Sequence, residues 1–178
     1  MKSVPQIERV ATLDAAAVAG LAALLVDAVD GGASVGFHAP LRRHAALAYW
    51  RDVAASLDAD NMLWIARDAQ QRVTGSVQLQ RARRENGRHR AEVCKLLVLR
   101  DARRNGIASQ LMAAVEAQAT ASGVSLLVLD TEVQSPAEAF YQRQGWQRAG
   151  EIPDFASNAA GALLGTALYF KPLRRTPG

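Results

Sequence analysis

The sequence is organised around residues 91–119, AEVCKLLVLRDARRNGIASQLMAAVEAQA. Within it, Val93–Leu99 is a short apolar run rich in branched residues, which is typical of a buried strand. After a basic turn, apolar residues return at the spacing of an amphipathic helix, at Ile107, Leu111, Met112, Val115 and Ala119. The stretch therefore predicts a strand, a basic turn that contains glycine, and a helix.

The turn between this strand and helix, Arg103-Arg104-Asn105-Gly106, favours the binding of phosphate. The first amides of a helix have no partner inside it and carry the positive end of the helix dipole, so an anion can bind there. Gly106 has no Cβ, which lets a ligand approach the backbone closely. The same residues also suit an ordinary solvated turn, and these arguments alone leave both interpretations open.

Composition indicates a folded protein with a real core. The chain has 178 residues, of which 49% are hydrophobic and 21% charged, with a net charge of +4 that suits a polyanionic cofactor or nucleic acid. No apolar run approaches the ~20 residues of a membrane span, and the start of the chain lacks a signal-peptide pattern, so we expect a cytoplasmic protein without membrane contact. The single cysteine, Cys94, excludes an internal disulfide and is expected to be structural. Three histidines and one cysteine without ligand spacing predict no metal site.

The remaining segments predict strands and helices in the order β-α-α-β-β-β-α-β-α-β-β, as one mixed α/β domain over residues 1–178. The further strands are expected at residues 6–10, 62–67, 73–80, 124–130, 146–149 and 166–170, and the further helices at 13–29, 41–57 and 134–145. We expect residues 153–165 to form a loop and residues 172–178 to fray.

Three of these segments carry more specific patterns. Val73–Gln80 alternates apolar and polar residues, which predicts an antiparallel strand with one wetter face. Asn86-Gly87 within the charged run 81–90 predicts the tip of a hairpin, with a nucleic-acid patch as the alternative. Ser135 and Glu138 predict an N-cap and a capping box at the start of the helix 134–145.

Two elements of the chain resemble motifs of the GNAT family of N-acetyltransferases. Arg103-x-x-Gly106-x-Ala108 is similar to the family's [QR]-x-x-G-x-[GA] pyrophosphate loop, and it lies between a strand and a helix as in the family. Residues 137–146, AEAFYQRQGW, are similar to the family's A-x-x-[FL]-Y-x-x-x-G-[FW] pattern. The similarity to one branch of the family extends in order from about Asp30 to Lys171, through GGASVGF (31–37) and LDTE (129–132).

This resemblance implies a mixed, mostly antiparallel sheet of six to seven strands with a splayed parallel pair, flanked by about four helices. It implies acetyl-CoA as cosubstrate, without a metal. The residues that it assigns to acetyl-CoA are Val98, whose backbone N–H would face the oxyanion, and Arg103, Arg104, Asn105, Gly106, Ile107, Ala108 and Ser109. It also implies that the loop with Ser34, Val35 and Phe37 bounds the pocket for the acceptor.

The chemistry of amine acetylation selects three catalytic candidates. The carboxyl ends of the parallel strands would bring Asp130 and the Gly106 turn to one crevice, with Tyr141 on the following helix. Asp130 is the first candidate for the base that deprotonates the amine and Glu92 the second, while Tyr141 is the candidate acid beside the CoA sulfur. Tyr141 could instead be a core aromatic residue, and Asp130 a cap of a helix or loop.

The sequence thus predicts an enzyme that transfers an acetyl group to a primary amine of a small molecule by direct attack in a ternary complex. The acceptor could be an amino-acid-like toxin, an antibiotic or a metabolite, and the enzyme a monomer or homodimer. An enzyme that acetylates a protein N-terminus or lysine, and a CoA sensor without activity, are the alternatives. A nucleic-acid-binding domain is disfavoured because the chain shows no aromatic platform or zinc finger.

Overall fold

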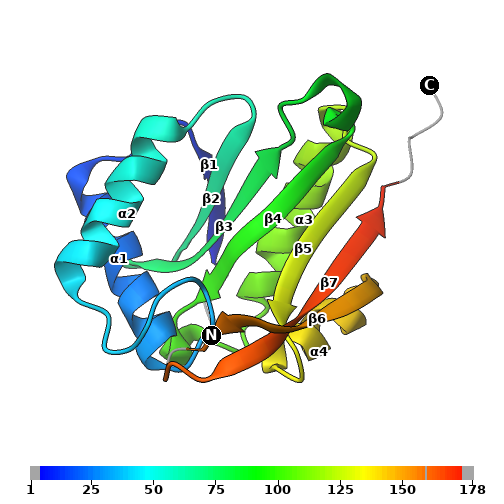
Figure 1. Cartoon of the computed structure of the whole chain (residues 1–178). Helices are drawn as coiled ribbons and strands as arrows, with labels where there is room; N and C mark the ends of the chain where they lie inside the picture. Colours follow the sequence, from blue (N-terminus) through cyan, green and yellow to red (C-terminus); the bar gives the residue numbers. More distant parts are fainter. Residues whose placement is uncertain (1–4, 159, 174–178) are drawn as a thin grey trace.

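The computed structural model describes residues 5–158 and 160–173 (Figure 1). The strands are β1 (Gln6–Val10), β2 (Asn61–Arg67), β3 (Val73–Arg81), β4 (Arg90–Val98), β5 (Leu126–Glu132), β6 (Gln147–Ser157) and β7 (Leu163–Pro172). The α-helices are α1 (Ala15–Asp30), α2 (Arg43–Ser56), α3 (Ile107–Ala121) and α4 (Pro136–Arg143). The order of elements and the mixed α/β class agree with the prediction.

Within the described residues, seven strands form one sheet in the order β1-β2-β3-β4-β5-β7-β6. Only β4 and β5 are parallel, and they pair over just three residues each, Arg90–Glu92 with Leu126–Val128. Beyond Glu92 the two strands separate, as Figure 1 shows toward their carboxyl ends. The predicted splayed pair is therefore present, and we call the opening between β4 and β5 the splay.

Helices cover both faces of the sheet (Figure 1). Trp50 of α2 packs with Leu63 and Ile65 on one face, together with α1. On the other face, Leu111 of α3 packs with Leu79 and residues of β5. Among the described residues, the helices include none that is long and apolar enough to cross a membrane.

The prediction of a wetter face on β3 is wrong. Thr74, Ser76 and Gln78 are all buried, at 2% exposed or less. The reason is that α1 and α2 cover the face of the sheet that carries these polar residues. Gly75 allows a close approach on the opposite face, because a Cβ there would lie 2.9 Å from Cγ2 of Ile107.

The hairpin predicted at residues 81–90 is present, since β3 and β4 pair in antiparallel fashion. Its tip is a short 3-10 helix, Glu85–Gly87, rather than a two-residue turn. Two of its arginines form ion pairs with the loop between α2 and β2, Arg83 with Asp58 and Arg88 with Asp60, both at 2.7 Å. The charged run is therefore partly neutralised by contacts within the molecule.

The loop predicted at residues 153–165 is wrong, because β6 continues to Ser157 and β7 begins at Leu163. The register shifts between Ile152 and Ala156, and Asp154 has a positive φ of 51°. This irregularity accommodates Pro153, which cannot donate a backbone hydrogen bond, within an outer strand. Pro172 of the predicted tail lies in β7, while residues 174–178 lie outside the described part of the chain.

The N-cap predicted for α4 is confirmed, because the Ser135 hydroxyl accepts a hydrogen bond from the Glu138 N–H at 3.1 Å. The second half of the capping box differs from the prediction. The Glu138 carboxylate accepts from the N–H of Gln134 at 2.6 Å, one residue before the cap. Glu138 thus fixes the chain that leads from β5 into α4.

Candidate active site

The basic turn forms an open backbone cradle at the start of α3. Gly106 is the N-cap residue with φ of 75°, and within the described residues no side chain caps this end of the helix. Arg103–Gly106 are exposed, so the first amides of a 15-residue helix face solvent and the dipole is uncompensated there. The cradle has the features that an anion needs.

The predicted residues of the cradle contribute in different ways. Ala108 and Ser109 are half-buried, and Ser109 is also close to α4, since the Gln144 amide lies 3.4 Å from its hydroxyl. The side chain of Ile107 packs in the core, so only its backbone N–H can reach a ligand. Asn105 donates to the carbonyl of Ala102 at 3.1 Å and stabilises the turn itself.

Val98 lies at the end of β4, where the splay is open. The N–H of Leu99 donates to the carbonyl of Thr74 on the β3 side, at 3.0 Å. Because successive residues of a strand direct their N–H groups to opposite edges, the N–H of Val98 points away from β3 and into the splay. Its carbonyl accepts a hydrogen bond from Nε of Arg103 at 3.3 Å, which ties the basic turn to this strand end.

Glu92 and Asp130 lie on the same face of the sheet, on either side of the splay. Glu92 is in register with Val128, and Asp130 follows two residues later on β5. Both side chains are exposed. The pKa of Glu92 is raised, first because neighbouring groups shield its carboxyl from water and second because Asp130 is negatively charged. The structure thus brings both predicted carboxylates together at one opening.

Tyr141 of α4 is buried against the α3 face, with its ring edge-on to Phe140 and Trp146 at centroid distances of 5.5 and 6.0 Å. Among the described residues, its hydroxyl has no hydrogen-bond partner. Burial raises the pKa of Tyr141 well above its usual value, and the charges of Asp130 and Cys94 raise it further. The ring is therefore part of the core, whereas the hydroxyl is protonated and electrostatically coupled to the groups of the splay.

Sequence reasoning missed a polar cluster beside these residues. Gln78 is completely buried, and its Oε1 accepts from the Tyr49 hydroxyl at 3.0 Å and lies 3.8 Å from Sγ of Cys94. Burial, followed by the charges of Glu92 and Asp130, raises the pKa of Cys94 to about 11, although Lys95 opposes this. The thiol is therefore protonated, which agrees with the structural role expected of Cys94. The sequence signal for this cluster was the set of alternating polar residues on β3. Because α1 and α2 cover the face on which these residues lie, they become buried.

The loop between α1 and α2 reaches the same face of the sheet. Phe37 packs edge-on against Tyr49 at 5.5 Å, while Ala33 and Val35 pack on the core of α1 and α2. Nε2 of His38 lies 2.6 Å from Oγ of Ser157, so this loop also contacts the end of β6. The structure thus places Phe37 at the wall of the cluster, while Ser34 is half-buried in the same loop.

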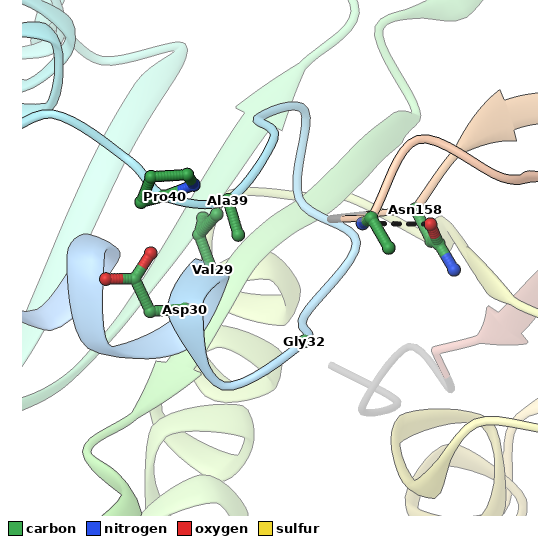
Figure 2. Close-up of a pocket in the computed structure, with 7 residues that line it drawn as sticks. Val29, Asp30, Gly32, Ala39, Pro40 and Asn158 are labelled. Atoms are coloured by element: carbon green, nitrogen blue, oxygen red, sulfur yellow. Dashed lines mark hydrogen bonds between the residues drawn. The ribbon is translucent and has the colours of Figure 1, made fainter.

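A surface hollow of about 580 Å³ lies between this loop and the β6–β7 turn, lined by Val29, Asp30, Gly32, Ala39, Pro40, Asn158 and Ala160 (Figure 2). None of the predicted catalytic residues lines it. The chemistry of the splay, rather than the size of this hollow, identifies the candidate site. Within the described part of the chain, no three His, Cys, Asp or Glu side chains are grouped as a metal site would require.

Comparison with known proteins identifies the family of the chain. The model of the acetyltransferase (GNAT) family matches residues 33–146, which is more than half of the chain. The chain therefore belongs to the GNAT acetyltransferase family and is a GNAT-type N-acetyltransferase.

Solved structures share the fold at low sequence identity. An N-acetyltransferase from Staphylococcus aureus Mu50 matches with a TM-score of 0.78 and 20% identity, over 97% of this chain and 100% of that one. A ribosomal-protein-alanine N-acetyltransferase from Brucella melitensis matches with a TM-score of 0.75 and 20% identity, over 94% of this chain and 99% of that one. A GNAT phosphinothricin acetyltransferase from Sinorhizobium meliloti, in complex with acetyl-CoA, matches with a TM-score of 0.76 and 18% identity, over 95% of this chain and 88% of that one.

Proposed function

We propose that this protein transfers the acetyl group of acetyl-CoA to a primary amine of a small molecule, within a ternary complex at the splay. The observation that carries the proposal is that five groups converge on one strand opening: an open helix N-terminus, an inward-facing strand N–H, two carboxylates, and a tyrosine hydroxyl that no described residue binds. Each of these groups corresponds to one requirement of acyl transfer to an amine.

The cradle fits the diphosphate of acetyl-CoA. The amides of Arg104–Ser109 would bind its oxygens, since Gly106 keeps the backbone accessible and Arg103 and Arg104 add positive charge. When bound, acetyl-CoA supplies an acetyl group activated as a thioester. The N–H of Val98, which points into the splay, would stabilise negative charge on the carbonyl oxygen of that group.

Asp130 or Glu92 would take the proton of the attacking amine. Both are exposed at the opening, so an acceptor can reach them from solvent. The raised pKa of Glu92 moves this carboxyl toward the range in which a base is effective near neutral pH. Asp130 lies across the splay, and its negative charge contributes to the raised pKa of both Glu92 and Tyr141.

Tyr141 would donate its hydroxyl hydrogen toward the leaving sulfur. A CoA thiol has a pKa of roughly 8.5, below that of the buried tyrosine, so complete proton transfer from Tyr141 is unfavourable. A hydrogen bond that strengthens as negative charge builds on sulfur needs no such transfer. We therefore assign Tyr141 as a hydrogen-bond donor to the departing thiolate, which takes its proton from solvent after it leaves.

The acceptor class is argued from two resemblances. The motifs of residues 30–171 resemble the tabtoxin-resistance acetyltransferase, which acetylates an amino-acid-like toxin, and the fold matches a phosphinothricin acetyltransferase. The same fold also matches a ribosomal-protein-alanine N-acetyltransferase, which is the reason to keep a protein acceptor as the second candidate. Contact between the α1–α2 loop and β6 narrows the opening and favours a small molecule. A role in toxin or antibiotic resistance and a cytoplasmic location belong to the same proposal.

The test is acetyl-CoA turnover, followed as the release of free thiol, across a panel of amines. The panel contains free amino acids, aminoglycosides, polyamines and peptides with free N-termini. We expect release that depends on a small amine. Release with peptides alone would establish the protein acetyltransferase instead, and tight acetyl-CoA binding without release on any acceptor would favour a sensor.

A further inference from the structure

Lys95 occupies an irregular position on β4, directly beside the splay. Its φ is +52°, and it lies where the β3–β4 register shifts between Ser76 and Gln78. The Ser76 hydroxyl donates to the carbonyl of Lys95 at 3.0 Å, which fixes this bulge. A bulge re-aims the side chain that follows the extra residue, and such irregularities are common next to active sites.

The bulge directs the Lys95 side chain to the face on which Glu92 and Tyr49 lie. Nζ of Lys95 is 5.5 Å from the centroid of the Tyr49 ring, a cation–π distance. The ring is itself held by the hydrogen bond from its hydroxyl to buried Gln78 and by edge contact with Phe37. The ammonium group is therefore placed by a rigid aromatic support at the wall of the candidate acceptor site.

Lys95 differs from Lys171 in its partners. Lys171 binds both carboxylate oxygens of Glu116, at 2.8 and 2.9 Å, and the carbonyl of Gln144. Within residues 5–158 and 160–173, Lys95 forms no ion pair or hydrogen bond through its ammonium group. Lys95 is half-buried, and its ammonium group lies over an aromatic ring with its three donors available, which suits an anionic ligand.

The charges around the splay are thus arranged in two parts. Glu92 and Asp130 provide negative charge where the amine would enter, and Lys95 provides positive charge on the same face near Tyr49. The cradle for the diphosphate lies at the start of α3, which covers the opposite face, so Lys95 is not required there. This arrangement matches a molecule that carries an amine and an anion a few bonds apart.

We propose that Lys95 binds the carboxylate of the acceptor, and that the acceptor is therefore a free amino acid or a close analogue with both an amine and a carboxylate. The inference rests on the proposed function, whose acceptor class it makes specific. Polyamines and aminoglycosides lack the anion, and they would bring additional positive charge against Lys95. A lysine within a protein also lacks a carboxylate near its amine.

The experiment compares each free amino acid with its carboxamide, which keeps the amine and removes the negative charge. Turnover is followed as thiol release, and binding to the CoA-loaded protein is followed by calorimetry, which does not require reaction. Wild-type protein, Lys95→Met and Lys95→Arg are compared. Lys171→Met is the matched control, because it removes the other lysine of the described residues, whose ammonium group binds Glu116 of α3.

We expect wild-type protein to prefer at least one free amino acid over its carboxamide by about 10- to 100-fold in kcat/KM, the usual effect of a charged hydrogen bond. Lys95→Met should remove this preference, mainly through KM, while acetyl-CoA affinity is unchanged. Lys95→Arg should keep part of the preference for the free amino acid over its carboxamide, and Lys171→Met should keep all of it.

Other results overturn the inference. Equal losses for acid and amide in Lys95→Met would mean that Lys95 only balances the charge of Glu92 and Asp130. Activity confined to acceptors without a carboxylate would reject the inference and leave the proposed function intact. Acetyl-CoA binding without amino-acid binding or turnover on any amine would reject both.

Discussion

The two edges of β5 differ in how completely their polar groups are satisfied. Toward β7, the strand pairs over seven residues, Leu126–Glu132. Beside that edge, buried Glu138 accepts from Tyr169 at 2.8 Å and contacts Arg148 at 3.3 Å, and Gln142 donates to Tyr169 at 2.8 Å. Although burial opposes it, these hydrogen bonds and the one from Gln134 lower the pKa of Glu138.

Toward β4, the same strand pairs over three residues and then stops. The tyrosine on this side, Tyr141, has a hydroxyl without a partner in the described part of the chain. Nε2 of buried Gln78 also has none there, and the pKa of Glu92 is raised, first because neighbouring groups shield its carboxyl from water and second because Asp130 is negatively charged. The groups beside the splay therefore keep hydrogen-bonding capacity that a ligand can use, whereas the satisfied network on the other edge stabilises the fold.

The largest expected effect comes from filling the cradle. Gly106→Glu should weaken acetyl-CoA binding by more than about 100-fold, or ~2.7 kcal/mol, since it adds a carboxylate where the diphosphate would bind. Gly123→Glu at the other end of α3 is the matched control. Its φ is +77° and a Cβ there meets nothing within 4 Å, so the backbone strain is similar.

Calorimetry with acetyl-CoA distinguishes the two variants. Gly123→Glu should bind normally even if its melting temperature falls. Normal binding by Gly106→Glu would remove residues 103–109 from the cofactor site.

The next effect separates the two tyrosines that border β5. Tyr141→Phe should lower kcat by about 100-fold or more while stability and acetyl-CoA affinity change little, because the lost hydroxyl has no hydrogen-bond partner among the described residues. Tyr169→Phe should leave kcat nearly unchanged and lower the unfolding free energy by ~1–3 kcal/mol, because it removes a donor to the buried Glu138 carboxylate. Steady-state kinetics and urea unfolding measure both. If Tyr141→Phe reacts like wild type, the hydroxyl has no part in the reaction.

A smaller effect concerns the pH dependence of stability. Because the pKa of Glu92 is raised on folding, the folded state holds this proton more tightly than the unfolded chain. Stability is therefore lost as pH rises from the ordinary glutamate pKa, about 4.3, through the raised value. Glu92→Gln should raise the melting temperature at about pH 7.5, and not at about pH 3.5 where both states are protonated.

Glu85→Gln, at the exposed tip of the β3–β4 hairpin, is the control and should show no such difference. Lower turnover of Glu92→Gln near neutral pH would identify Glu92 as the base. If Asp130→Asn alone loses activity, that role belongs to Asp130.

The smallest effect is expected at the contact between the α1–α2 loop and β6. His38→Ala removes a contact at the surface, between exposed His38 and half-buried Ser157, so unfolding free energy should change by less than about 0.5 kcal/mol. The KM for the acceptor should rise by about two- to fivefold, or ~0.4–1 kcal/mol, because the loop is less well positioned. Ser157→Ala should have the same effect, and a change in acetyl-CoA affinity instead would show that the loop does not serve the acceptor.

The sequence predicted the fold where periodicity and turn chemistry agree. The unit from β4 through α3 was visible because an apolar run, a glycine turn and a helical stripe follow one another within 29 residues. The later part of β6 and the start of β7 were missed because Pro153 and the small residues around it resemble a loop, and only the pairing of the two strands extends them through this segment. Local preference was overridden there by tertiary contact.

The candidate site was predictable only where recognisable strands, turns and helices place its residues. Gly106, Asp130 and Tyr141 follow recognisable elements, so topology alone brings them to one sheet opening. Lys95 and Tyr49 could not be found in this way. Their contact depends on a bulge in β4 and on the orientation of α2, neither of which leaves a pattern in the sequence.

The most direct test of the account is a crystal structure of the protein with acetyl-CoA. The account predicts the diphosphate on the amides of Arg104–Ser109, the acetyl oxygen facing the N–H of Val98, and the sulfur within hydrogen-bonding reach of Tyr141. Acetyl-CoA bound with its sulfur away from the splay, or with its diphosphate off the start of α3, would contradict it.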